Sequence, residues 1–174
     1  LRNDAASAVR ALQADGVRVH LLSGDAPERA AQVAAQLGLA TSEFTGGMSP
    51  ADKLAALRNA QQGGEIVAML GDGINDAPVL AQANLSLAMG EGALVARTQA
   101  DGVLVSNALG DVVRARALAK KALTVVRQNL LWAAAYNAAC VPLALVGWLP
   151  PWAAGLGMAS SSLFVVLNSL RLAR

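Results

Sequence analysis

A turn rich in glycine and acidic residues is the segment of this sequence best suited to chemistry. It reads Gly71-Asp72-Gly73-Ile74-Asn75-Asp76-Ala77-Pro78 and directly follows a short apolar run. Glycines let a backbone turn sharply and approach a ligand closely, and Asp72 offers the hard oxygen that Mg²⁺ prefers. Asn75 and Asp76 follow Asp72 closely enough for one helical turn to return them to the same side. A helix N-cap at Asp76, with Pro78 in the first turn, would explain Asp76 and Pro78 without a ligand. It would not explain Gly71-Asp72-Gly73.

Ser23-Gly24-Asp25 is a second polar turn, placed between an apolar run and a predicted helix. A hydroxyl and free backbone N–H groups at this place could hold phosphate oxygens. A capping box formed by Asp25 and Glu28 would account for the same turn without a ligand, and the two interpretations are compatible for Asp25.

A third polar turn, Ser49-Pro50-Ala51-Asp52-Lys53, begins a predicted helix that is capped by Ser49. Lys53 then lies in the first turn, where a cation opposes the helix dipole at a cost of roughly 0.3–1 kcal/mol. A lysine that neutralises a phosphoryl group would justify this placement. An ordinary solvated lysine is the alternative.

Short apolar runs alternate with helical stretches through the N-terminal region, which predicts an α/β fold with a parallel sheet covered by helices. The expected strands are Val17–Leu22, Ile66–Leu70, Leu85–Ala88 and Val103–Val105. The expected helices are Asp4–Ala14, Pro27–Leu37 and Pro50–Gln62. Ligands of open parallel sheets sit beyond the carboxyl ends of the strands, so we expect the three turns to meet in one pocket. His20 is expected to be a buried histidine of the first strand.

A long stretch without charge predicts that the C-terminal part crosses a membrane. Charged residues are scattered as far as Arg127, and none then occurs before Arg171. Two prolines and two tryptophans interrupt the stretch at 148–152, so we expect two helices, Asn129–Gly147 and Ala153–Leu170, that form a transmembrane hairpin. Basic residues flank only the outer ends of this hairpin, which places both ends and the N-terminal region in the cytoplasm.

Composition sets the remaining limits. Hydrophobic residues make up 55% of the chain and charged residues 15%, proportions that suit membrane segments. A formal charge of +2 and 3% aromatic residues argue against a nucleic-acid partner, and a single cysteine excludes an intrachain disulfide. The expected organisation is an α/β domain over 1–110, a connecting helix over 111–128 and the two membrane helices over 129–174. Because Leu1 is not an initiator methionine, we expect the chain to start within a longer protein.

Taken together, the three turns resemble the P-type ATPases of the haloacid-dehalogenase-like superfamily. The motifs hydroxyl-Gly-Asp, Pro-x-Asp-Lys and Gly-Asp-Gly-x-Asn-Asp-x-Pro occur in this order on successive βα units, and the match extends over essentially the whole chain. The resemblance implies part of a haloacid-dehalogenase-like Rossmannoid parallel sheet, the C-terminal part of a phosphorylation domain, followed by the last two transmembrane helices. It also implies that the residues around the phosphoryl group are Ser23, Gly24, Asp25, Lys53, Asp72, Asn75 and Asp76.

Each of these residues inherits a role from the resemblance. Asp72 would ligate the catalytic Mg²⁺, and Asn75 and Asp76 would support the phosphoryl group and the metal shell. Lys53 would neutralise the phosphoryl oxygens. Ser23 and Gly24 would bind those oxygens, and Asp25 would complete the site. Catalysis would then consist of positioning and electrostatics around an aspartyl phosphate.

Two features depart from the family pattern. The phosphorylated aspartate of the Asp-Lys-Thr-Gly motif occurs nowhere in these 174 residues, and neither do the nucleotide-binding and actuator domains. The chain alone is therefore expected not to hydrolyse ATP, although the complete pump would be an ATPase. The second departure is Gly46-Gly47-Met48, where the family usually has a more strand-like approach to its proline.

Polar residues in the predicted spans point to the transported ion, since such residues are costly in a membrane and usually functional. Tyr136 and Asn137 are adjacent in the first span, and Met158 and Ser162 share one face of the second at i, i+4. A thioether favours Cu(I) over Zn²⁺ or Ca²⁺, although serine and methionine also serve in helix packing. Cys140, one turn after Tyr136, is expected to be a packing residue.

Tyr-Asn followed by Met-x-x-Ser-Ser looks like the last two helices of the copper(I) pumps, with Ser161 a further candidate ligand. Zinc and cadmium pumps typically keep a lysine and an aspartate in these helices, and neither span has a charge here. The resemblance implies Mg²⁺ as cofactor, ATP as substrate and Cu⁺ as cargo. It implies membrane lipid, upstream domains of the same pump and a copper chaperone as partners, and a multi-pass location in the bacterial inner membrane.

Three other functions are compatible with parts of the sequence. The chain could belong to a pump for another heavy-metal cation, or to a membrane-tethered phosphatase of the same superfamily. The phosphatase would leave Tyr136-Asn137 and the Met158–Ser162 pattern unexplained. A truncated pump could also act as an inactive regulatory fragment.

Overall fold

The computed structural model of the protein describes residues 1–72 and 74–173, with the backbone alone for Ile74 and Ala173. The predicted turning role of Gly73 and the flanking charge of Arg174 therefore lie outside the described residues. The chain divides into two compact units, Leu1–Val113 and Arg114–Arg174.

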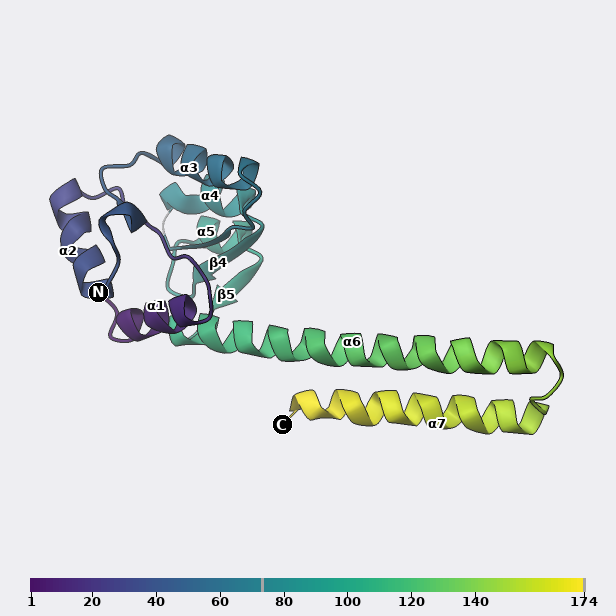
Figure 1. Ribbon diagram of the computed structural model, residues 1–174. Helices are drawn as coiled ribbons and strands as arrows, with labels where there is room; N and C mark the ends of the chain where they lie inside the picture. The colour runs from purple at the N-terminus through teal and green to yellow at the C-terminus, as the bar shows by residue number, and fades with distance from the viewer. Residues whose placement is uncertain (73, 174) are drawn as a thin grey trace. The chain divides into compact units, whose positions relative to one another are not determined.

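The first unit alternates helices with short strands, as predicted (Figure 1). Its helices are α1 (Ala5–Ala14), α2 (Pro27–Leu37), α3 (Pro50–Gln62), α4 (Ala77–Gln82) and α5 (Leu94–Gln99), with 3₁₀ turns η1 (Thr41–Glu43) and η2 (Ile74–Asp76). Its strands are β1 (Leu21–Leu22), β2 (Phe44–Thr45), β3 (Ala68–Gly71), β4 (Leu85–Met89) and β5 (Gly102–Leu104).

All strand pairs are parallel, which confirms the predicted α/β class. They form two separate sheets among the described residues, one of β1 and β2 and one in the order β3-β4-β5. The prediction was wrong for the first strand, because only Leu21 and Leu22 of the run Val17–Leu22 pair with a neighbour. His20 precedes β1 and is exposed, so it is not a core histidine.

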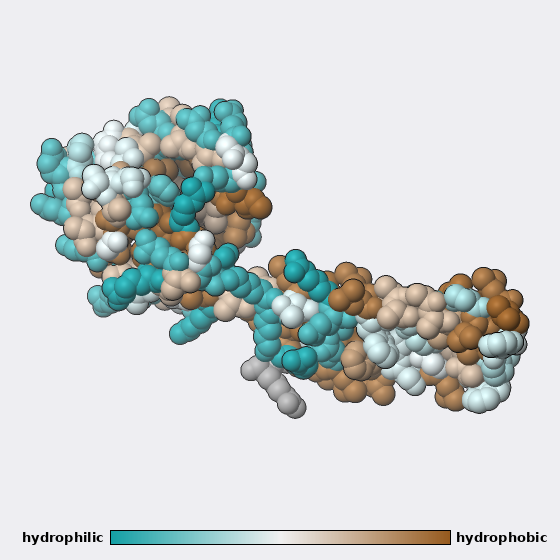
Figure 2. All heavy atoms as spheres, viewed as in Figure 1, coloured by the Kyte–Doolittle hydropathy of each residue, from teal (hydrophilic) through white to brown (hydrophobic). Residues whose placement is uncertain are grey.

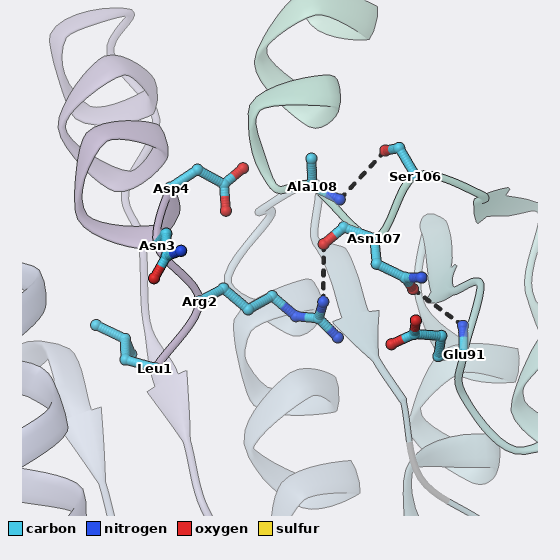
Figure 3. Close-up of a pocket in the computed structure, with 8 residues that line it drawn as sticks. All are labelled: Leu1, Arg2, Asn3, Asp4, Glu91, Ser106, Asn107 and Ala108. Atoms are coloured by element: carbon cyan, nitrogen blue, oxygen red, sulfur yellow. Dashed lines mark hydrogen bonds between the residues drawn. The ribbon is translucent and has the colours of Figure 1, made fainter.

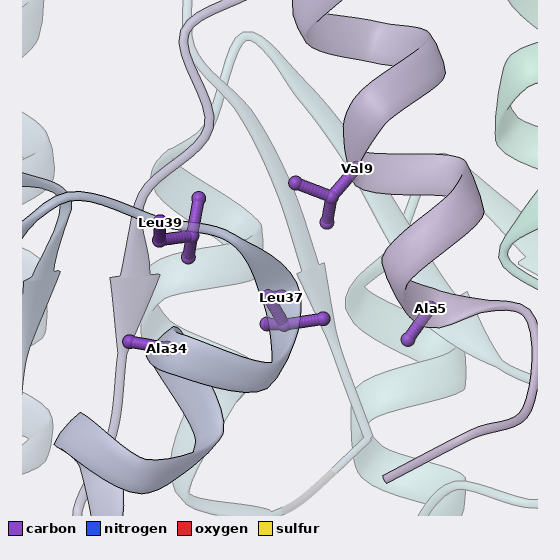
Figure 4. Close-up of a cluster of buried hydrophobic side chains, with 5 residues drawn as sticks. All are labelled: Ala5, Val9, Ala34, Leu37 and Leu39. Atoms are coloured by element: carbon purple, nitrogen blue, oxygen red, sulfur yellow. The ribbon is translucent and has the colours of Figure 1, made fainter.

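Two small apolar clusters hold the first unit together. The larger one packs α1 against α2 through Ala5, Val9, Ala34, Leu37 and Leu39, all buried (Figure 4). The smaller one joins α4, β4 and α5 through Leu80, Ala88 and Ala96. Alanines at these contacts let helices approach closely, which suits a sequence so rich in that residue.

A serine–aspartate clamp fixes β4 against the start of β5. Ser86 is 2% exposed, and its backbone N–H and Oγ both donate to Asp101 Oδ2, at 2.8 and 2.9 Å. The backbone N–H of Asp101 donates in return to Ser86 Oγ at 3.0 Å. These hydrogen bonds favour the carboxylate and hold the pKa of Asp101 below the ordinary value of 3.8.

The clamp predicts an acid-sensitive contribution to stability. A folded-state pKa below the unfolded one stabilises the fold at pH values above the ordinary pKa, and this contribution is lost as pH falls through the depressed pKa. Ser86→Ala removes two of the hydrogen bonds and should lower stability at neutral pH while flattening its decline in acid. Amide exchange of β4 and β5 measured against pH checks this expectation. An unchanged acid profile in Ser86→Ala would show that Asp101 does not contribute through Ser86.

The second unit is a helical hairpin. Its helices are α6 (Gly110–Leu145), which begins in the first unit, and α7 (Pro151–Ser169), followed by the 3₁₀ turn η3 (Leu170–Ala173). The two run antiparallel and side by side (Figure 1). Trp132 of α6 donates from Nε1 to Ser161 Oγ at 3.0 Å, and its ring lies 4.6 Å from that of Phe164. The predicted connecting helix and first span are therefore one continuous helix, and the predicted break at the prolines is confirmed.

Among the described residues, one helix is long and apolar enough to cross a membrane, Pro151–Leu172, with a mean hydropathy of 1.5. The other predicted span, Asn129–Gly147, lies within α6 as far as Leu145, so a second crossing stays a prediction. Figure 2 shows hydrophobic residues gathered around the α6–α7 turn and hydrophilic residues over the other end of the hairpin.

Candidate functional site

Backbone hydrogen bonds connect the Ser23-Gly24-Asp25 turn to residues 45–48, just before the Ser49–Lys53 turn. Ser23 donates its N–H to Thr45 O at 2.9 Å, and its own carbonyl accepts from Met48 N at 3.0 Å. Gly47 N donates to Asp25 O, and Asp25 N donates to Ser23 Oγ at 3.1 Å. The Ser23 turn is thus held against the segment that leads directly into α3.

The unusual Gly46-Gly47-Met48 segment makes this contact possible. A Cβ on Gly46 would lie 2.7 Å from Pro27 Cα, so only glycine lets the segment lie against the start of α2. Gly47 has a φ of 69°, which favours glycine. Helix α2 begins with Ala26 as its N-cap and has no side-chain cap, so the capping box of Asp25 with Glu28 is absent from the described structure. Asp25 and Gly24 are exposed, and Ser23 is half-buried.

A capping box fixes the start of α3, as predicted from Ser49. Asp52 N donates to Ser49 Oγ at 3.2 Å, and Ser49 N donates to Asp52 Oδ2 at 2.9 Å. The hydrogen bonds from the Ser49 side chain and backbone lower the pKa of Asp52 below its ordinary value. The Lys53 side chain therefore projects from a defined position in the first turn of α3.

Lys53 and Asp76 form a nearly buried ion pair. The Lys53 Nζ lies 2.8 Å from Asp76 Oδ1, and the two side chains are 13% and 12% exposed. Asp76 precedes α4 but makes no side-chain cap, so the interpretation of its side chain as a helix cap was wrong. A Cβ on Gly71 would lie 2.9 Å from Asp76 Cβ, so the glycine at the end of β3 lets Asp76 reach the strand.

Asp72 follows β3 and is exposed. Its backbone is fixed, because its carbonyl accepts from Ala93 N at 2.8 Å. Within the described ranges its carboxylate has no hydrogen-bond or ion-pair partner, whereas the Asp76 carboxylate is paired. Asn75, in η2, is also exposed.

The three turns are therefore linked in series. The Ser23 turn bonds to the segment before α3, α3 presents Lys53 to Asp76, and Asp76 lies against the end of β3 that bears Asp72. A pair of carboxylates suits Mg²⁺, which proteins hold through one or two carboxylates while water and phosphate complete the octahedron. No group of three or more His, Cys, Asp or Glu side chains able to hold a metal occurs in the described part of the chain.

A surface pocket of about 440 Å³ lies elsewhere on the first unit (Figure 3). It is lined by residues 1–4, Glu91 and residues 106–108, and shares none of the residues of the three turns. Arg2 reaches across it to donate to Asn107 O at 2.8 Å, and Asn107 Oδ1 accepts from Glu91 N at 2.9 Å. Asn107 has a φ of 56°, a conformation that asparagine tolerates. Sequence reasoning had no signal for this pocket, since its residues form no motif.

The candidate transport residues lie along the hairpin. Tyr136 is half-buried, and its hydroxyl lies against Gly157 of α7, where a Cβ would come within 2.6 Å of it. Asn137 and Ser162 are exposed, and Met158 is 65% exposed. Only Tyr136 among the four candidates therefore faces the neighbouring helix of the hairpin.

The other three candidates share one side of the hairpin. Asn137 follows the contact residue Tyr136, Met158 follows Gly157, and Ser162 follows Ser161, which accepts from Trp132. Both helices are right-handed and run in opposite directions, so the residue after a contact residue projects to the same lateral side on each. Asn137, Met158 and Ser162 consequently line one open side of the hairpin. Ser161 itself faces α6, and Cys140 is half-buried.

A family model described as haloacid dehalogenase-like hydrolase matches residues 1–84, which include all three turns. The parallel α/β unit with acidic and basic groups beyond its strands is thus of the haloacid-dehalogenase-like class.

Relatives match the entire chain. A probable copper-exporting P-type ATPase V of Mycobacterium tuberculosis is 45% identical over 174 residues, which are 100% of this chain and 22% of the relative. A cation-transporting P-type ATPase B of Mycobacterium bovis is 45% identical over 99% of this chain and 23% of its own length. The crystal structure of a zinc-transporting PIB-type ATPase in its E2·Pi state superposes with a TM-score of 0.93 and 39% identity, over 100% of this chain and 28% of that one.

The chain belongs to the heavy-metal P-type ATPases, and the predicted resemblance is confirmed. It spans about a fifth of the length of the curated relatives it matches.

Proposed function

We propose that this chain is part of an ATP-driven copper(I) efflux pump and supplies half of its phosphorylation site together with part of its ion path. The observation that carries the proposal is the nearly buried Lys53–Asp76 pair at the junction of the three turns. A lysine and an aspartate held together beside an open carboxylate suit a site that binds a phosphoryl group and Mg²⁺ at once.

Each residue of the site has a proposed role that is consistent with its position. Asp72 and Asp76 would hold Mg²⁺, with Asn75 beside them, and the metal would neutralise charge on the phosphoryl oxygens. Lys53 would turn from its ion pair with Asp76 toward the same oxygens. The phosphoryl oxygens would also be bound from the opposite loop, by the Ser23 hydroxyl, the Gly24 backbone and Asp25. Hydrogen bonds hold this loop against the segment that leads into α3.

The phosphorylated aspartate would come from another segment of the pump. The strands β1 and β3 belong to different sheets, yet Arg18 just before β1 forms an ion pair with Glu65 just before β3. An added parallel strand between β1 and β3 would join the two sheets and end beside Ser23, Lys53 and Asp72. This position suits an aspartyl nucleophile, because parallel strands bring their functional groups to one edge. The isolated chain should accordingly be inactive.

Copper is the cargo that the hairpin supports best. Asn137, Met158 and Ser162 share one open side, and the thioether of Met158 is a soft ligand. No acidic residue lies in either predicted span, and a divalent cation would be expected to need one. The names of the relatives point to both copper and zinc, so the alternative cargo is Zn²⁺. A multi-pass location in the bacterial inner membrane, with the first unit in the cytoplasm and a copper chaperone as donor, completes the proposal.

Met158→Ala tests the cargo in the complete pump. Loss of the thioether should lower Cu(I)-stimulated turnover at least roughly tenfold, the scale of losses at metal sites. Leu156→Ala is a matched control, since Leu156 is 63% exposed and lies on the opposite side of α7 at nearly the same depth. Equal turnover in the two variants, or stimulation by Zn²⁺ that survives in Met158→Ala, would count against a copper site.

A further inference from the structure

The loop between β4 and α5, residues 90–93, lies directly against the backbone of Asp72. Ala93 donates its backbone N–H to Asp72 O at 2.8 Å. A Cβ on Gly92 would come within 2.8 Å of the same carbonyl oxygen and 3.1 Å of Asp72 Cα. The loop and Asp72 are therefore packed backbone to backbone, and a shift of the loop would shift the residue that carries the open carboxylate.

Asn107 holds the first half of the same loop (Figure 3). Its side-chain Oδ1 accepts a hydrogen bond from Glu91 N at 2.9 Å. Beside this contact, Gly90 N donates to Leu104 O at 2.9 Å, and a Cβ on Gly90 would lie 2.8 Å from that oxygen. The loop is thus fixed at one end by residues 104–107 and at its other end against Asp72.

The backbone of Asn107 suits it to this contact. Its φ of 56° is the one positive value at a non-glycine position in the described part of the chain, and asparagine tolerates this left-handed conformation better than most residues. Asn107 N donates to Leu104 O at 3.0 Å, and Arg2 donates to Asn107 O at 2.8 Å, so both of its peptide groups are held. Glycine could share the conformation but not the acceptor, whereas aspartate could share both.

We propose that Asn107 is a positioning residue for the metal site: through the loop 90–93 it fixes the backbone of Asp72, so that the Asp72 carboxylate is already in place when Mg²⁺ binds. This proposal rests on the proposed function, since it takes Asp72 as a metal ligand. Residues that orient a metal ligand from outside typically change metal affinity about 10–100-fold when they are replaced. Because Asn107 acts one contact further away, through a single hydrogen bond, we expect a change of roughly threefold to tenfold.

The test titrates the full chain with Mn²⁺ and follows the broadening of the Asp72 amide signal. Asn107→Gly keeps the left-handed backbone and removes the acceptor, so it should raise the Mn²⁺ concentration for half-broadening roughly threefold to tenfold. Asn107→Asp keeps an acceptor at the same place and should recover most of the lost affinity. Equal affinity in Asn107→Gly and the wild-type chain would overturn the proposal, and so would an Asn107→Asp chain that binds as weakly as Asn107→Gly.

Gly92→Ala tests the loop from the side of Asp72. The φ of Gly92 is not positive, so the substitution acts through the contacts of its added Cβ, the shortest of which is 2.8 Å from Asp72 O. It should weaken Mn²⁺ binding at least as much as Asn107→Gly does, although the hydrogen bond between Asn107 and Glu91 is not removed. Wild-type affinity in Gly92→Ala would show that the loop does not position Asp72 and would refute the proposal.

Ser106→Ala is the matched control. The Ser106 hydroxyl accepts from Ala108 N at 3.2 Å and donates to Asp111, so the substitution disturbs the segment around Asn107 without removing the hydrogen bond to the loop. This variant should bind Mn²⁺ as the wild-type chain does. A loss equal to that in Asn107→Gly would mean that any disturbance of the segment lowers the affinity, which would contradict a specific role of the Asn107 side chain.

Amide exchange distinguishes positioning from a general loss of stability and needs no metal. In Asn107→Gly, exchange of the Ala93 N–H should accelerate roughly threefold to tenfold, while the amides of β3 and β4 should exchange as in the wild-type chain. Faster exchange throughout both strands would indicate a structural role alone and would rule out positioning. A wild-type chain whose Asp72 signal does not broaden with Mn²⁺ would reject the metal site of the proposed function together with this proposal, whereas broadening that Asn107→Gly leaves unchanged would reject this proposal alone.

Discussion

Asp72→Ala is expected to abolish Mg²⁺-dependent phosphorylation of the complete pump. The Asp72 carboxylate is exposed at the end of β3, while its backbone is held by Ala93, so the substitution removes a charge without removing a contact that the fold uses. Loss of one group that stabilises charge at a reacting centre typically costs at least about a hundredfold in rate. The measurement is the phosphoenzyme level formed from labelled ATP over a range of Mg²⁺ concentrations.

A matched substitution separates this effect from a general loss of charge. Asp15→Asn removes a carboxylate at the end of α1, outside the three turns, and should leave phosphoenzyme formation unchanged. Asp72→Asn keeps the shape of the side chain and should be as inactive as Asp72→Ala. Normal phosphoenzyme levels in either Asp72 variant would reject the assigned metal-binding role.

Lys53→Met is expected to destabilise the first unit by about 3 kcal/mol. Breaking a buried ion pair from one side leaves a charge uncompensated and costs about 3–5 kcal/mol, and the remaining exposure of both side chains favours the lower end. All three tryptophans lie in the second unit, so their fluorescence would not report this change. Amide exchange at β3, Ala68–Gly71, is the suitable measurement.

A double variant and a control variant test the Lys53–Asp76 ion pair further. Lys53→Met/Asp76→Leu removes the two charges together and should recover most of the lost stability, because an apolar pair can replace a buried ion pair. Arg18→Met breaks the exposed pair with Glu65, whose side chains are 70% and 40% exposed, and should cost less than about 1 kcal/mol. Similar losses in Lys53→Met and Arg18→Met would show that Lys53–Asp76 is an ordinary surface pair.

Local patterns predicted those parts of the fold that local interactions determine. The bounds of α2 and α3 match the prediction, because Pro27 and Pro50 fix the first turns and Ser49 caps α3 within its own segment. The break between α6 and α7 follows from Pro150 and Pro151 in the same way. The parallel arrangement followed from the alternation of apolar runs and helices.

Features that depend on distant partners were not predictable in this way. The strand β2 has only two residues and exists because β1 pairs with it. Asp76 was assigned both to the site and to a helix cap by its position, and only the tertiary approach of α3 shows that its side chain pairs with Lys53. His20 fitted an apolar run, but no neighbouring strand covers it among the residues that the structure describes. Hydrophobic periodicity also could not predict the division into two sheets, because this division depends on which strands pair with one another.

The convergence of three turns on one metal and phosphate site can be tested by paramagnetic broadening of backbone amide signals with Mn²⁺, which takes the same oxygen ligands as Mg²⁺. In the full chain, the amides of Ser23, Lys53 and Asp72 should broaden together at Mn²⁺ concentrations that leave Glu65 and Asn84, at the opposite ends of the strands, sharp. Broadening confined to Asp72 and its sequence neighbours, with Ser23 and Lys53 unaffected, would contradict a shared site.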